Sequence, residues 1–138
     1  MSKLFSTKHD SNNLDIATLL LRVFPAGFML SHGYPKFMKV LEGNFEFGDP
    51  LGLGPAASLI LAAFAEFICS LLVILGLGTR LAVIPLIITM LTAAFIAHGD
   101  DPFGRKELSL LYLVVFVVLF LTGSGRFSVD SALASKRR

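Results

Sequence analysis

The sequence predicts an all-α fold, an integral membrane four-helix bundle that forms a single transmembrane domain over residues 1–138. Hydrophobic residues make up 54% of the 138 residues and charged residues only 16%. The mean hydropathy of +0.75 lies well outside the range of water-soluble globular proteins. In addition, four apolar runs are long enough, or nearly so, to cross a bilayer, and glycine-rich or charged segments separate them.

The four expected spans follow from the length that a bilayer requires. A helix rises about 1.5 Å per residue, so crossing about 30 Å of hydrocarbon takes about 20 mostly apolar residues. The spans are expected at residues 14–31, 56–77, 81–97 and 108–122, the last two slightly short. The first could instead be a cleaved signal peptide, but Arg22 in its apolar core favours a retained helix. The short turn between the second and third spans predicts an antiparallel hairpin.

The distribution of basic residues near the span ends predicts that both termini are cytoplasmic. With the N-terminus inside, seven Lys and Arg residues lie on the cytoplasmic side and four on the other side. The seven are Lys3, Lys8, Arg80, Arg126, Lys136, Arg137 and Arg138, and the four are Lys36, Lys39, Arg105 and Lys106. Residues 33–55 then form a long non-cytoplasmic loop, in which residues 36–42 are expected to form a helical turn or two.

Composition also limits the partners that the protein can have. The lipid bilayer is the partner that the apolar composition requires. The net charge of +2 is small and the basic residues are scattered, so no nucleic-acid-binding surface is expected. The single cysteine, Cys69, excludes an internal disulfide and leaves only an intermolecular thiol partner open. No metal site is predicted.

Two charged residues lie deep within the expected spans, Arg22 in the first and Glu66 in the second. A charge near the middle of a bilayer costs at least about 2.5 to 3.5 kcal/mol, so each of them needs a partner. Counted from the cytoplasmic ends of their spans, Arg22 lies about 12 Å deep and Glu66 about 16 Å deep. We therefore expect a buried Arg22–Glu66 ion pair, which either fixes helix register or lines a cavity for a proton, a quinone head group or an anion.

Two histidines, His32 and His98, end the first and third spans at the same expected non-cytoplasmic level. They could ligate a haem or a metal or exchange protons, whereas solvation at the membrane interface is the simpler interpretation. Together with Lys36 and Glu66 they form the candidate ligand-binding set, and a quinone is the ligand that we consider.

Prolines interrupt two of the expected spans, Pro25 in the first and Pro85 in the third. A proline inside a helix frees the carbonyl four residues earlier and often kinks the helix. Each proline is therefore either a device that opens space for a ligand or a tolerated packing irregularity.

Short motifs are distributed along nearly the whole chain, from about Leu14 to Asp130. They are Arg22, His32-Gly33, Lys36, Ala65-Glu66, Gly78-Thr79-Arg80, His98, and Gly125-Arg126-Phe127-Ser128 with Asp130. Each motif alone is weak, but together they resemble the DoxX family of small four-helix bacterial membrane proteins.

The resemblance implies a multi-pass protein of the inner (plasma) membrane and a component of an oxidoreductase system. That system would be quinone-linked, or related to thiol, sulfur or oxidative-stress chemistry, with partner redox proteins. Relatives include a subunit of an archaeal thiosulfate:quinone oxidoreductase and a mycobacterial protein that associates with superoxide dismutase. Related eukaryotic proteins act as cargo receptors, so an assembly factor, cargo receptor or small transporter is the alternative. The resemblance leaves open whether the protein forms a homo-oligomer, and it assigns no catalytic residue to this sequence.

Overall fold

The computed structural model describes residues 3–137, and its regular elements in that range are all helical. Arg138, counted above among the basic residues, lies outside this range. The elements are a short 3-10 helix at Lys3–Phe5, α1 at Ser11–Leu41, α2 at Pro55–Ala63, α3 at Ser70–Leu75, α4 at Thr79–Thr92, α5 at Phe103–Thr122 and α6 at Val129–Lys136. Two π-helical segments, η2 at Phe64–Cys69 and η3 at Ala93–Ala97, continue α2 into α3 and extend α4.

Helix α1 is much longer than the span expected at residues 14–31. Asp10 caps its start by accepting a hydrogen bond of 2.9 Å from the Asn12 backbone N–H, and the helix continues through Pro35 to Leu41. The residues expected to form separate helical turns at 36–42 therefore belong almost entirely to α1. The irregular connection to α2 shrinks to residues 42–54.

Three of the four expected spans are present as helices long and apolar enough to cross a membrane. They are Ser11–Leu41, the continuous rod Pro55–Leu75, and Thr79–Ala97. Helix α5 has 20 residues, but charged side chains at positions 105–107 lie among its first five residues. The chain is thus a multi-pass membrane protein with three candidate spans, and the crossing by α5 remains a proposal.

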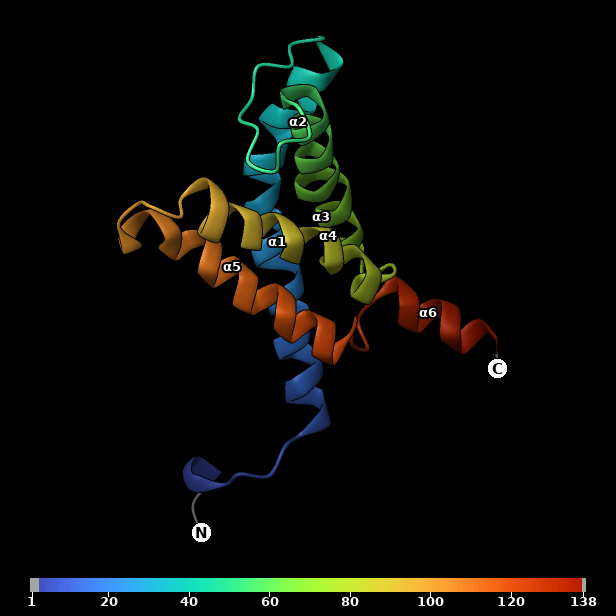
Figure 1. Ribbon diagram of the computed structural model, residues 1–138. Coiled ribbons are helices and arrows are strands. Elements are labelled where there is room, and N and C mark those ends of the chain that lie inside the picture. The colour runs from blue at the N-terminus through green and yellow to red at the C-terminus, as the bar shows by residue number, and fades with distance from the viewer. Residues whose placement is uncertain (1–2, 138) are drawn as a thin grey trace.

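The long helices form two pairs that cross each other (Figure 1). Helix α1 lies beside the rod α2–η2–α3, and the hairpin of α4 and α5 runs obliquely across this pair. The sequence predicts a four-helix bundle without fixing the angles between its helices, and the structure shows an all-α arrangement in which the two pairs of long helices cross. Fully buried side chains from all of them meet at the crossing, among them Met29, Val73, Leu86 and Phe116.

Candidate functional site

A cavity of about 450 Å³ lies between α2–η2 and α4–η3, close to the end of α1. Most of its lining is apolar, with only a few polar groups. Lys36 comes from α1; Ser58, Leu61, Ala62, Phe64, Ala65 and Glu66 come from α2 and η2; Pro85, Ile88, Thr89, Thr92, Ala93 and Ala97 come from α4 and η3; and Phe47, Pro50, Leu51 and Leu53 come from the connection between α1 and α2. Its size falls in the range of about 300 to 1,000 Å³ that is typical of small-molecule sites.

The charged part of the cavity is an ion pair between Lys36 and Glu66. The Lys36 Nζ lies 2.5 Å from the Glu66 Oε2, and the side chains are 26% and 5% exposed, respectively. Both residues belong to candidate spans, α1 and the rod Pro55–Leu75. Attraction between opposite charges is strong where water is scarce, so each group is a suitable partner for the other beside an otherwise apolar space.

A close approach between α1 and η2 produces this pairing. A Cβ atom on Gly33 would lie 2.7 Å from the Phe67 backbone nitrogen and closer still to the Glu66 carbonyl, so only glycine fits there. Lys36 follows one turn later on the same side of α1, next to Glu66. Glu66 itself lies in a π-helical segment, a local irregularity that often marks functional sites.

The connection between α1 and α2 covers one side of the cavity. The Asp49 Oδ1 accepts hydrogen bonds from the Gly54 backbone N–H at 3.0 Å and the Ser58 hydroxyl at 3.2 Å. The Lys39 ammonium donates to the Glu46 carbonyl. The Phe47 ring then lies 6.0 Å from the Lys36 Nζ, within the range of a cation–π contact. The connection is therefore anchored at both ends over the ion pair.

The wall opposite η2 contains Pro85 and the second π-helical segment, η3. Pro85 lacks the N–H of a regular helix, and the Thr89 hydroxyl donates a hydrogen bond of 2.7 Å to the Pro85 carbonyl. Pro85 therefore belongs to the wall of the cavity. Pro25 lies outside the lining of this cavity.

The predicted Arg22–Glu66 ion pair is wrong. The Arg22 guanidinium instead donates to three backbone carbonyls, those of Ser124 at 2.5 Å, Phe127 at 2.7 Å and Ile74 at 3.3 Å. It is 98% buried and joins α1 to the end of α3 and to the connection between α5 and α6.

The Arg22–Glu66 pair was expected because the start of the first span and the end of the second were assumed to lie at the same depth in the membrane. In the structure they do not. Arg22 lies beside Gly76 at that end, so the residues of α1 before it extend beyond the turn. Gly33, which touches Glu66, lies 11 residues further along α1, a rise of about 16 Å. Glu66 is therefore out of reach of Arg22 and within reach of Lys36.

Two of the four candidate ligand-binding residues, Lys36 and Glu66, meet at the cavity, whereas His32 and His98 lie outside its lining. His32 is exposed and contacts the edge of the Tyr112 ring at a centroid distance of 6.0 Å. The His98 Nδ1 lies 2.7 Å from the Asp101 Oδ2, and this hydrogen bond lowers the pKa of the Asp101 carboxyl. Within residues 3–137, no group of three or more potential ligands could hold a metal ion.

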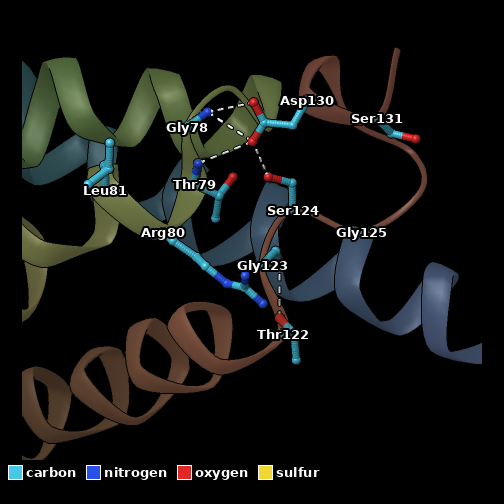
Figure 2. Close-up of a pocket in the computed structure, with 10 residues that line it drawn as sticks. All are labelled: Gly78, Thr79, Arg80, Leu81, Thr122, Gly123, Ser124, Gly125, Asp130 and Ser131. Carbon is cyan, nitrogen blue, oxygen red and sulfur yellow. Dashed lines mark hydrogen bonds between the residues drawn. The ribbon is translucent and has the colours of Figure 1, made fainter. Parts of the chain in front are cut away.

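A second hollow, of about 380 Å³, lies where the end of α5 meets the start of α4 (Figure 2). Asp130 accepts hydrogen bonds from the Gly78 backbone N–H at 2.9 Å, the Thr79 backbone N–H at 3.5 Å and the Ser124 hydroxyl at 2.5 Å. Burial raises the pKa of Asp130, but these hydrogen bonds outweigh it and hold the pKa below its ordinary value. Because Arg80 likewise binds carbonyls at the end of α5, the polar groups here act mainly to join chain segments.

Sequence reasoning missed the covering connection and most of the apolar lining. A signal was present in the cluster of Phe47, Pro50, Leu51 and Leu53, which is unusually apolar for a segment between helices. The motif Gly125 to Asp130, by contrast, is a structural device that ties α6 to the α3–α4 turn.

Comparison with known proteins shows which sequences this chain resembles. The family model described as DoxX matches residues 17–99, which include Lys36 and Glu66. A Bacillus subtilis protein, "Putative oxidoreductase CatD", is 33% identical over 121 residues, covering 87% of this chain and 89% of its own length. An uncharacterized membrane protein of Mycobacterium tuberculosis is 31% identical over 141 residues, covering 87% of this chain and 83% of its own. No solved structure matches the chain significantly.

Proposed function

Because the chain belongs to the DoxX family of membrane proteins, we propose that it is the membrane component of an oxidoreductase system and that it binds a quinone in the Lys36–Glu66 cavity. The name of the CatD relative, which carries an oxidoreductase label, supports the redox assignment. We assign the protein to the inner (plasma) membrane and expect a partner redox protein to exchange electrons with the bound quinone.

A single observation carries this proposal: an apolar cavity contains one donor and one acceptor of opposite charge side by side. A quinone presents carbonyl oxygens that accept hydrogen bonds, and Lys36 can donate to them. The quinol presents hydroxyl groups that donate, and the Glu66 carboxylate can accept from them. The same two residues therefore suit both oxidation states, while the Phe47 ring beside Lys36 offers an aromatic face to the head group.

Ligand titration of the purified protein tests the proposal. Calorimetry with decylubiquinone in mild detergent should show saturable binding to the wild type. The double variant Lys36→Gln/Glu66→Gln should bind at least about tenfold more weakly, a change of about 1.4 kcal/mol. It removes both charges together, so no unpaired charge remains in the cavity to unfold the protein.

The control variants change polar residues that lie outside the cavity. Lys106→Gln changes a lysine that binds the Gly99 carbonyl outside the cavity and should leave binding unchanged. His32→Ala and His98→Ala should also bind like the wild type, because neither histidine lines the cavity. Absence of saturable binding to the wild type would refute the quinone proposal and favour the assembly, cargo-receptor or transport alternative.

A further inference from the structure

We infer that the bound quinone enters sideways from the bilayer and that its tail leaves the cavity through a gap between α2–η2 and α4. The inference rests on the proposed quinone function and adds the class of ligand, a long-tailed quinone dissolved in the membrane. Apolar side chains on the two walls of the cavity are each only about half buried. Leu61 and Phe64, on one wall, are 53% and 46% exposed, and Ile88, on the other, is 54% exposed.

The gap lies at the depth of the hydrocarbon chains. Both of its walls belong to candidate spans, Pro55–Leu75 and Thr79–Ala97. Leu61 lies about 9 Å along the first of these from its start, and Ile88 lies about 14 Å from either end of the second. In a bilayer, side chains exposed at this depth contact lipid rather than water, so an opening between them leads into the membrane.

The hydroxyl groups that line the cavity are already hydrogen-bonded within the protein. The hydroxyls of Thr89 and Thr92 donate to carbonyls of their own helix, those of Pro85 and Ile88. The route from the Lys36–Glu66 pair to the gap is therefore lined by apolar surface. A polar ligand would lose its hydration along this route without gaining hydrogen bonds, whereas an aliphatic tail would not.

The covering connection and the size of the cavity support the same route. Pro50, Leu51 and Leu53 close the cavity on the side of the connection between α1 and α2 with further apolar surface. A volume of about 450 Å³ holds a quinone head and the beginning of a tail, so a longer tail has to continue outside the protein. The gap between α2–η2 and α4 is the place where it meets lipid directly.

Comparing quinones with and without a tail tests the inference on the full-length protein in lipid nanodiscs. The probes are decylubiquinone and the tailless ubiquinone-0, with affinities corrected for partition into empty nanodiscs. The wild type should bind decylubiquinone at least about tenfold more tightly. Ala62→Phe, which places a ring in the cavity wall near the gap, should abolish that advantage, so that the two quinones bind this variant with equal affinity. Ala56→Phe, on the same helix outside the cavity lining, should retain it.

A covalent probe gives a second readout that does not depend on affinity. Decylubiquinone carrying a photoreactive azide at the tail end should label residues of Pro55–Cys69 and Thr79–Ala97 near the gap. Equal affinity for the two quinones, an unchanged tail advantage in Ala62→Phe, or labelling confined to α1 or α5 would overturn the lateral route while leaving the quinone site intact. If neither quinone binds the wild type, both the lateral route and the proposed function fail.

Discussion

At the scale of single residues, the two buried charges of the spans have different kinds of partner. Glu66 pairs with a lysine side chain, whereas Arg22 donates to backbone carbonyls near the end of α3 and beyond the end of α5. An arginine suits this second task because its guanidinium presents five N–H donors in a fixed, planar arrangement. Glu66 therefore contributes to the cavity, whereas Arg22 has a structural role in joining chain segments.

Double-mutant cycles distinguish these two roles. Lys36→Gln and Glu66→Gln should be strongly non-additive in stability, because the second change relieves the charge stranded by the first. Breaking a fully buried pair costs about 3 to 5 kcal/mol, and the partial exposure of Lys36 should reduce the loss below that range. Arg22→Gln combined with Glu66→Gln should be additive within about 0.5 kcal/mol. The measurement is thermal unfolding in mild detergent, and coupling between Arg22 and Glu66 would contradict the assigned contacts.

At the scale of elements, one glycine decides how closely α1 packs against η2. Gly33→Ala should destabilise the protein by about 1 to 3 kcal/mol, because the added Cβ meets backbone atoms of Glu66 and Phe67 that cannot move aside independently. The same change should weaken quinone binding by displacing Glu66. Gly27→Ala is the matched control, since nothing lies within 4 Å of the new Cβ in the same helix.

The control is expected to shift stability in the opposite direction. Alanine is favoured over glycine inside a helix by about 0.5 to 1 kcal/mol, so Gly27→Ala should raise the unfolding temperature slightly. Equal effects of the two substitutions on unfolding temperature would show that α1 and η2 do not touch at Gly33.

The link between α6 and α4 should depend on pH through Asp130. Because the folded-state pKa of this carboxyl is lowered, its stabilising effect is fully present above the unfolded pKa of about 3.9 and is lost as the pH falls towards the folded value. Asp130→Asn should therefore cost about 1 kcal/mol at pH 7, as for other helix-capping carboxylates, and progressively less below about pH 4. Unfolding temperatures of the wild type and variant across this range, with the exposed Asp100→Asn as control, provide the check. A difference that stays constant with pH would contradict the carboxylate's role.

The same elements show what the sequence could and could not predict. Hydropathy located the long helices because a bilayer demands about 20 apolar residues in each. The first span was expected to end at residue 31, yet tertiary contact at Gly33 and beyond keeps α1 helical to Leu41. The partner of Glu66 depends on how far α1 extends past the α3–α4 turn, and the oblique crossing of the helix pairs depends on side-chain packing. Neither is encoded in hydropathy or in residue spacing.

At the scale of the whole molecule, the position of the end of α5 bears on how often the chain crosses the membrane. Helix α4 begins at the α3–α4 turn, and α5 returns along it to end beside the same turn. Contacts made by Arg22, Arg80 and Asp130 join these segments. If α4 crosses the bilayer, α5 must therefore cross back. The charged side chains at positions 105–107, which set α5 apart from the other candidate spans, then lie at the level of the head groups.

Four crossings predict that residues 39 and 136 lie on opposite sides of the membrane, with both termini cytoplasmic. With a cytoplasmic N-terminus and only three crossings, eight Lys and Arg residues would lie outside and three inside, the reverse of the positive-inside rule. Alkaline phosphatase and green fluorescent protein fusions after Lys39 and after Lys136 test this arrangement. The first site should be active only with phosphatase and the second should fluoresce. Matching signals at the two sites would contradict four crossings and, with them, the contacts that join Asp130 to the α3–α4 turn.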